Sequence, residues 1–262
     1  MRSVACQPEI HMSSSIDISE QKGVRYLHFG SEWVQGAMRI ARPLNLELAY
    51  TREMMAGLLM RDDANWPRRI LLIGLGAASL TKFCYWKLPQ SRLTVVEIDA
   101  RVVSAARQFF KLPDEDERLH IEIADGVEFI RQGNAQFDYI LVDGYDEDAK
   151  VGALDSLPFY QACWARLSEN GLLAVNLFGR TRRYGPSIQR MSEAFDTRAM
   201  AFPSCDSGNV IAFAARGEAV DVSAAVLRKR ADELVTASGL DLRPTVSRLE
   251  EAKVLEGGVL RI

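Results

Sequence analysis

Apolar and amphipathic stretches alternate in a regular order through the middle of the chain. Short apolar runs have the length of strands buried on both faces, at 69–74, 93–97, 119–124, 137–142 and 171–178. Amphipathic stretches separate these runs and predict helices, at 78–87, 100–110, 126–132 and 156–167. Strands that alternate with helices of this length form parallel βαβ units with right-handed crossovers. The pattern therefore predicts an α/β protein with a doubly wound, mostly parallel sheet.

The flanking sequence predicts smaller elements. Residues 1–21 are polar and Ser-rich and predict a flexible arm, followed by strands at 24–29 and 33–40 that form a hairpin. The other elements expected are a helix at 46–60, a helix at 187–195, strands at 197–202 and 210–215, and an amphipathic helix at 220–238. Four units follow from this pattern: the arm at 1–21, a hairpin region at 22–45, a nucleotide-binding α/β domain at 46–220, and a C-terminal helix and extension at 221–262.

Composition narrows the class of protein. The chain has 262 residues, of which 48% are hydrophobic, so it can bury a core without disulfides or metals. A formal net charge of −3 gives no electrostatic footprint for nucleic acid. The 4 cysteines have long, irregular spacings, which argues against a disulfide framework or a zinc site. With no apolar signal segment and no apolar run near ~18 residues, we expect a cytoplasmic protein without a membrane partner.

Residues that follow the predicted strands are candidates for a binding site, because ligands of open parallel sheets bind beyond the carboxyl ends of the strands. Gly74, Gly76 and Ala77 follow the first strand, and small residues there let a ligand approach the start of a helix. Glu97 ends the second strand. An acid about 20 residues after the glycine turn is at the spacing at which a carboxylate meets ribose hydroxyls, and Glu97 follows Gly74 by about this distance. A glycine turn also occurs without any ligand. This spacing is compatible with a nicotinamide dehydrogenase and with an enzyme of the S-adenosylmethionine type.

Acidic residues also follow the third and fourth strands. Asp125, before Gly126, can accept a hydrogen bond from an adenine amino group, and it can also cap the next helix. Asp143 and Asp146 follow the fourth strand on one loop, where two carboxylates can hold a cationic amine and one can accept its proton. An alkylammonium has a pKa near ~10, so an amine nucleophile must lose a proton before it attacks carbon. The same acids are equally compatible with an acidic surface loop.

Taken in order, these residues resemble the spermidine/spermine synthase family, the polyamine aminopropyltransferases. The similarity runs from about Gln35 to Phe213. Its motifs are Gln35, Tyr50, the loop Ile73-Gly-Leu-Gly-Ala-Ala-Ser79, Glu97-Ile98-Asp99, Asp125-Gly126, Asp143-Gly-Tyr-Asp146, Gly152-Ala153 and Phe159-Tyr160. Their occurrence together in this order is far more specific than any one of them.

The resemblance implies a fold and a reaction. The fold would be a seven-stranded Rossmann-like sheet of the S-adenosylmethionine-dependent methyltransferase type behind an N-terminal β-hairpin. The reaction would move an aminopropyl group from decarboxylated S-adenosylmethionine to a di- or polyamine and release methylthioadenosine, with no metal and no tightly bound cofactor. Family members are commonly dimers or tetramers, so the resemblance implies a homodimer.

The resemblance also implies roles for the site residues. Glu97 would hold the ribose and Asp125 the adenine, and Asp143 would deprotonate the attacking amine. The remaining residues would contact the donor or position the amines: Gln35, Gly74, Gly76, Ala77 and Gly126 on the donor side, and Tyr50, Asp146 and Asn176 on the acceptor side.

Several positions depart from the family pattern. Ala77 stands where the family has an Asp that meets the donor's amino group, and Asn176 stands where it has Gln. In the late motif at 204–208, Cys205 replaces a Tyr. The family's Asp would repel the carboxylate of ordinary S-adenosylmethionine, and Ala77 lacks this charge. Ala77 therefore favours an alternative, a methyltransferase that uses ordinary S-adenosylmethionine. The altered 204–208 segment favours another alternative, a non-catalytic relative that binds an adenosyl ligand.

Overall fold

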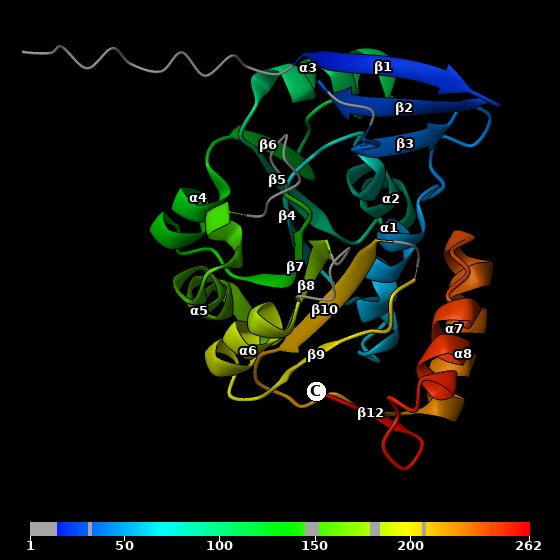
Figure 1. The fold of residues 1–262 in the computed structure, drawn as a ribbon, viewed down its shortest axis with the longest axis vertical. Helices are drawn as coiled ribbons and strands as arrows, with labels where there is room; N and C mark the ends of the chain where they lie inside the picture. The colour runs from blue at the N-terminus through cyan, green and yellow to red at the C-terminus, as the bar shows by residue number, and fades with distance from the viewer. Residues whose placement is uncertain (1–14, 31–32, 145–151, 179–183, 206–207) are drawn as a thin grey trace, which may run out of the picture.

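A seven-stranded sheet forms the centre of the molecule, with the strand order β6-β5-β4-β7-β8-β10-β9 (Figure 1). The structure is a computed structural model that describes residues 15–30, 33–144, 152–178, 184–205 and 208–262. The strands from β6 to β8 are parallel, and β10 runs antiparallel to both of its neighbours. The strand bounds are β4 (Arg69–Ile73), β5 (Arg92–Glu97), β6 (Leu119–Ile123), β7 (Phe137–Val142), β8 (Leu167–Phe178), β9 (Ala199–Ala201) and β10 (Asn209–Ala215).

Helices cover both faces of this sheet, which confirms the doubly wound α/β fold. Along β4, Ile70 and Leu72 enter the core on one face, and Leu71 and Ile73 enter the core on the other. Burying each such side chain contributes about 1.5–3 kcal/mol to the free energy of unfolding. The first face carries α2 (Ser79–Lys87) and α3 (Ala100–Phe109), and the second carries α4 (Gly126–Gln132), α5 (Leu157–Arg166) and α6 (Gly185–Ala194).

A small antiparallel sheet precedes the central one, in the order β1-β2-β3. Its strands are β1 (Ile16–Gln21), β2 (Val24–Phe29) and β3 (Gly36–Arg39). The expected hairpin is therefore present, but a flexible arm that reaches residue 21 is wrong, because residues 16–21 pair with β2 throughout. The reason is that β1 is an edge strand with mostly exposed polar side chains. Only Ile16 and Ile18 pack against the small core, so the apolar alternation is short, and Lys22-Gly23 forms the two-residue turn that pairs β1 with β2.

A short helical segment and the C-terminal elements lie on the α2 face. The helix predicted at 46–60 is α1 (Ala49–Glu53) followed by the 3₁₀ helix η1 (Met54–Leu59). The C-terminal elements are β11 (Asp221–Ser223), α7 (Ala224–Ser238), α8 (Arg243–Glu251) and β12 (Val259–Arg261), of which α7 and α8 lie beside α1 (Figure 1).

The C-terminal helix predicted from residue 220 begins at residue 224 instead. Residues 221–223 form β11 and pair with β12, close to the C-terminal end of the chain. The Ser223 hydroxyl then accepts a hydrogen bond from the Val226 amide and caps α7. The local apolar pattern does not reveal a partner strand so far along the chain, so the predicted helix wrongly included residues 221–223.

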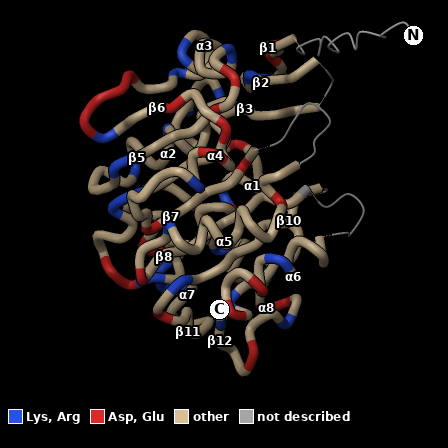
Figure 2. The backbone as a smooth tube through the Cα atoms, turned by 90° about the vertical axis from the view of Figure 1, so that its left-hand side faces the viewer, with Lys and Arg blue, Asp and Glu red and all other residues tan. Residues whose placement is uncertain are grey.

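Charged residues of both signs are spread over the surface. Figure 2 shows Lys and Arg interspersed with Asp and Glu along the backbone. Among the described helices, none is both long and apolar enough to cross a membrane.

Candidate functional site

A cavity of about 250 Å³ opens at the carboxyl edge of the central sheet. It lies where the strand order reverses, because the chain runs outward from β4 to β6 and then returns to β7 on the other side of β4. The residues that line it are Phe29, Gln35, Ile73, Gly74, Gly76, Val96, Glu97, Ile98, Ala124, Asp125, Gly126, Val127, Asp143, Gly144, Gly152, Ala153 and Leu154. The small N-terminal sheet, β4, β5, β6, β7 and η2 (Gly152–Asp155) thus all contribute to one cavity.

The turn between β4 and α2 requires glycine at position 74. Gly74 has φ of +95°, in the left-handed region, and a Cβ there would lie 2.4 Å from the Asp143 carbonyl oxygen. The Asp143 amide also donates to the Ile73 carbonyl at 2.9 Å. The loops that follow β4 and β7 are therefore in direct backbone contact, which fixes where Asp143 stands relative to the glycine loop.

Glu97 is buried at the end of β5 with its carboxylate held by the backbone. Its Oε2 accepts from the Leu75 amide at 2.9 Å, and its Oε1 accepts from the Asp99 amide at 3.0 Å. Burial raises the pKa of Glu97, and these backbone donors partly offset the rise. Each oxygen has a further lone pair, so a carboxylate fixed in this way at the cavity wall can accept hydrogen bonds from a pair of vicinal hydroxyls.

Asp125 lines the cavity and caps α4. Its Oδ1 accepts from the amides of Val127 at 2.7 Å and Glu128 at 3.0 Å. A cap of this kind contributes about 1 kcal/mol to helix stability. Both bonds use Oδ1, so the cap does not occupy Oδ2. The capping role and the ligand-binding role that the sequence left open for Asp125 are geometrically compatible.

Asp143 is held by two side chains from distant parts of the chain. The Tyr50 hydroxyl on α1 donates to Oδ2 at 3.1 Å, and the Asn176 amide on β8 donates to Oδ1 at 2.8 Å. Burial raises the pKa of Asp143, and the hydrogen bonds from Asn176 and Tyr50 lower it in part. The result is a half-buried carboxylate with fixed orientation and enhanced basicity, which is what a proton acceptor at neutral pH requires.

The remaining predicted residues are placed differently. Gln35, Gly76 and Gly126 line the cavity together with Gly74. Ala77 does not line it: its methyl group packs in a small core against Leu27, Met38 and Phe110. Asp146 lies outside the described residues, so its place is not known.

Apolar residues of the cavity escaped the sequence analysis. Ile98, between Glu97 and Asp99, lines the cavity and is 68% exposed. The sequence did carry a signal for it, because an isoleucine just beyond a buried strand is a candidate for a ligand contact. Leu154 belongs to η2, and Phe29 ends β2. Phe29 has no signal in the sequence, because only the docking of the small sheet brings it to the cavity.

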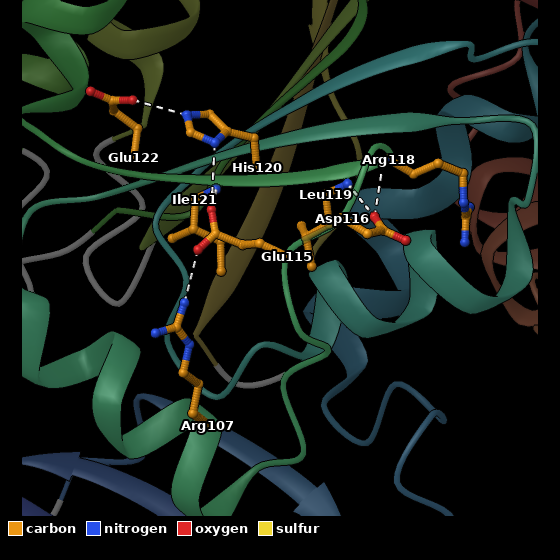
Figure 3. Close-up of polar contacts among 8 residues, drawn as sticks. All are labelled: Arg107, Glu115, Asp116, Arg118, Leu119, His120, Ile121 and Glu122. Atoms are coloured by element: carbon orange, nitrogen blue, oxygen red, sulfur yellow. Dashed lines mark hydrogen bonds and ion pairs between the residues drawn. The ribbon is translucent and has the colours of Figure 1, made fainter.

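A separate polar cluster lies on the surface near β6 (Figure 3). Glu115 accepts from the Ile121 amide at 2.8 Å and pairs with Arg107 at 2.9 Å, and His120 contacts Glu122 at 3.1 Å. The His120 side chain is 64% exposed. These contacts fasten the segment before β6 to the strand. No cluster of His, Cys, Asp and Glu among the described residues is arranged to hold a metal ion.

Comparison with known proteins gives consistent matches. The family model of the spermine/spermidine synthase domain matches residues 47–177. A polyamine aminopropyltransferase of Chromobacterium violaceum is 36% identical over 256 residues, which cover 98% of this chain and 97% of that protein. A crystal structure of a probable spermidine synthase from Corynebacterium glutamicum has a TM-score of 0.69 at 20% identity, and covers 92% of this chain and 96% of its own. The human methyltransferase-like protein 13 in complex with SAH has a TM-score of 0.65 at 22% identity, over 73% of this chain and 93% of its own.

Proposed function

The chain belongs to the spermine/spermidine synthase family and is a transferase, and from this premise we propose that it moves an aminopropyl group from decarboxylated S-adenosylmethionine to a di- or polyamine. The observation that carries the proposal is the Asp143 carboxylate, half-buried at the cavity wall and oriented by Tyr50 and Asn176. A fixed, basic carboxylate of this kind suits an enzyme whose nucleophile is an amine that arrives protonated.

The charges of the cavity support the decarboxylated donor. Three carboxylates line it, and those of Glu97 and Asp125 lie on the adenosine side that both donors share, which leaves Asp143 on the side of the donor tail. None of the described lining residues is Lys, Arg or His. A donor whose tail ends in an ammonium group alone is attracted by this lining, whereas the carboxylate of ordinary S-adenosylmethionine is repelled. The cavity thus supports the aminopropyl donor over the methyl donor.

The adenosine half of the donor fits the residues present. We assign the ribose hydroxyls to Glu97, whose carboxylate is locked by two backbone amides, and the adenine to Asp125 and the neighbouring apolar wall. Ile98 and Leu154 supply apolar surface for the purine ring. Gly74 and Gly76 let the loop after β4 approach the ligand closely.

The reaction is then a displacement at the carbon beside the sulfonium. Asp143 takes a proton from the acceptor ammonium, the nitrogen lone pair forms a C–N bond, and the C–S bond breaks. The electron pair of that bond returns to sulfur, which leaves as the neutral thioether of methylthioadenosine. The contribution of the protein is alignment and deprotonation, and general-base catalysis of this kind is worth roughly 10²–10⁴-fold in rate.

The test is release of methylthioadenosine from decarboxylated S-adenosylmethionine with a panel of diamines and polyamines. We expect turnover by the wild-type protein and a loss of roughly 10²–10⁴-fold in Asp143→Asn. Asp138→Asn is the matched control: Asp138 lies near the start of β7, the strand that Asp143 follows, and it accepts from the Arg68 and Arg69 amides at the amino ends of the strands. Absence of release with every amine contradicts the proposal.

Calorimetry with the two donors separates the proposal from its alternatives. We expect decarboxylated S-adenosylmethionine to bind at least about tenfold tighter than S-adenosylmethionine, a difference of about 1.4 kcal/mol. Tighter binding of S-adenosylmethionine, with methyl transfer to an acceptor, indicates the methyltransferase instead. Binding of adenosyl ligands without any turnover indicates the non-catalytic relative.

We further propose that the protein acts in the cytoplasm as a homodimer without metal or nucleic acid. The support is the likeness to a family whose members are commonly dimers or tetramers. Light scattering after size-exclusion chromatography measures the mass directly, against 29.3 kDa for one chain. Turnover that is unchanged by a metal chelator supports the absence of a metal, and cell fractionation tests the location.

A further inference from the structure

The helix that carries Tyr50 depends on other elements for its position. α1 spans only Ala49–Glu53 and continues into the 3₁₀ helix η1, so it is too short to be stable by itself. Tyr139 on β7 accepts a hydrogen bond from the Gly57 amide at 3.2 Å, and Arg230 on α7 donates to the Leu59 carbonyl at 2.9 Å. These contacts hold η1. The part of the segment next to Tyr50 is held by a different contact, at Glu53.

Glu53 is a buried carboxylate, 3% exposed, on the helix turn that follows Tyr50. Its Oε2 accepts from the Thr245 hydroxyl at 2.7 Å and forms an ion pair with Arg248, both on α8. Its Oε1 is buried and has no hydrogen-bond partner among the described residues. Arg248 is therefore the principal compensation for this buried charge, and loss of Arg248 leaves Glu53 poorly satisfied.

Arg248 also holds a second segment. Its Nε donates to the Pro203 carbonyl at 3.2 Å. The preceding residue, Phe202, donates its amide to the Ile211 carbonyl at 2.9 Å, and Ile211 stands opposite Asn176 in the pairing of β10 with β8. One guanidinium thus lies behind both segments that supply hydrogen bonds to Asp143: α1 with Tyr50, and the β8–β10 ladder with Asn176.

We propose that Arg248 and Glu53 are positioning residues for the amine-activating carboxylate: α8 clamps α1 and the segment at Pro203 so that Tyr50 and Asn176 remain aligned on Asp143. This inference rests on the proposed function. Neither Arg248 nor Glu53 lines the cavity, so both act through Tyr50 and the β8–β10 ladder rather than on a ligand. The C-terminal helix thereby becomes part of the acceptor side of the site.

The consequence to be measured is the basicity of Asp143. The Tyr50 hydrogen bond lowers the pKa of Asp143 from the value that burial alone would give. A displaced α1 weakens this bond, so Arg248→Met should raise the pKa of Asp143 in the same direction as Tyr50→Phe. The acid limb of the pH profile of kcat/KM should move to higher pH in both variants.

The experiment compares Tyr50→Phe, Arg248→Met, their double variant and a control. Arg228→Met is the matched control, because Arg228 pairs with Glu250 between α7 and α8 and touches neither α1 nor Pro203. The pKa of Asp143 is measured by carbon NMR of Asp-labelled protein, with Asp143→Asn to identify the signal. This titration needs no turnover. It therefore tests the clamp even if the wild-type protein releases no methylthioadenosine, a result that contradicts only the proposed function.

We expect Tyr50→Phe and Arg248→Met each to lower kcat/KM for the amine about tenfold, with methylthioadenosine affinity within twofold of wild type. Because Arg248 acts in part through Tyr50 and in part through the ladder with Asn176, the double variant should lose more than about tenfold but less than the about hundredfold to which independent effects multiply. Arg228→Met should match the wild type. Arg248→Lys keeps one charged donor, so its kcat/KM should lie between those of Arg248→Met and wild type. If Arg248→Met does not fold, Arg248→Lys replaces it in the comparison.

Two results overturn the inference. One is a folded Arg248→Met, or Arg248→Lys if only that variant folds, with the wild-type pKa at Asp143. The other is a loss of methylthioadenosine affinity equal to the loss of kcat/KM, which indicates general damage to the fold.

Discussion

Asp143 is half-buried at the cavity wall and receives two hydrogen bonds, and the balance between desolvation and these bonds sets its chemistry. Burial raises its pKa toward that of the amine that it must deprotonate, while Tyr50 and Asn176 stabilise the charged form. Carboxylate is the form that accepts a proton, so activity exists above the folded-state pKa and is lost as the pH falls through it. We expect an acid limb in kcat/KM that is absent from the binding of methylthioadenosine.

Stability should show the opposite dependence on pH at the same residue. Because the folded-state pKa of Asp143 is raised, the folded protein holds this proton more tightly than the unfolded chain. The contribution of Asp143 to stability is therefore largest below its ordinary pKa and is lost as the pH rises through the raised value. Asp143→Asn has no carboxyl group to titrate and does not lose this stability. The Tm of the variant minus the Tm of wild type should therefore increase from acid to neutral pH. Thermal unfolding of both proteins across this range measures the difference, and a Tm difference independent of pH contradicts it.

Glu97 gives a second prediction at the scale of one residue. Glu97→Gln keeps the shape but replaces charge-assisted hydrogen bonds to ribose, which are worth about 1.5–3 kcal/mol. We expect methylthioadenosine affinity to fall by roughly 10–100-fold in calorimetry. Glu122→Gln on β6 is the control, since Glu122 contacts His120 on the surface. Unchanged affinity in Glu97→Gln assigns the ribose elsewhere.

Among the elements, η2 shows how a cavity wall is fastened from behind. Gly152, Ala153 and Leu154 line the cavity, and Asp155 ends the element. Asp155 accepts from the hydroxyls of Tyr160 at 2.7 Å and Ser187 at 2.8 Å, and it pairs with Arg190 at 2.5 Å. The wall next to the adenine position is thus tied to α5 and α6.

Asp155→Asn should loosen this wall. The amide keeps one acceptor oxygen but loses the charge that Arg190 faces, so we expect a loss of about 1–3 kcal/mol in the free energy of unfolding. Methylthioadenosine should also bind more weakly. Chemical denaturation and calorimetry measure the two effects, and Asp241→Asn, which breaks the exposed pair with Arg243, is the control. Full affinity in a destabilised Asp155→Asn shows that η2 does not shape the ligand site.

At the scale of the whole molecule, the small N-terminal sheet completes the cavity by docking on the glycine loop. A Cβ at Gly36 would lie 2.6 Å from the Ala77 Cβ, so β3 approaches the loop as closely as backbone allows. Ser79 adds a hydrogen bond to the Ala37 carbonyl at 3.1 Å. The docked sheet brings Phe29 and Gln35 to the cavity.

Gly36→Ala should force the sheet away from the loop. Overpacking of this kind reduces the free energy of unfolding by about 1–3 kcal/mol. Because Phe29 and Gln35 move with the sheet, we also expect weaker donor binding in calorimetry. Gly185→Ala is the matched control, since a Cβ there meets no described residue within 4 Å. Wild-type stability in Gly36→Ala contradicts the close docking.

The same contact changes the meaning of Ala77. From the sequence, the alanine appears as a lost charge at the donor tail. In the structure its methyl group faces the N-terminal sheet and does not line the cavity. We therefore base the proposed donor preference on Asp143 and on the lack of Lys, Arg and His among the described lining residues rather than on position 77. The proposed domain boundaries beyond the N-terminal arm and the roles of the site residues stay predictions.

The sequence by itself determined the order of the central strands and helices and placed Glu97, Asp125 and Asp143 at one edge of a sheet. It did so because strands buried on both faces are recognisable as apolar runs, and because the carboxyl ends of parallel strands meet at the same edge. Tertiary structure alone decided the pairing of β11 with β12, the docking of Phe29, and the hydrogen bonds from Tyr50 and Asn176 to Asp143. Each of these joins segments that are far apart along the chain, through strand pairing, packing or a single polar contact, and none of these leaves a periodic signal in the local sequence.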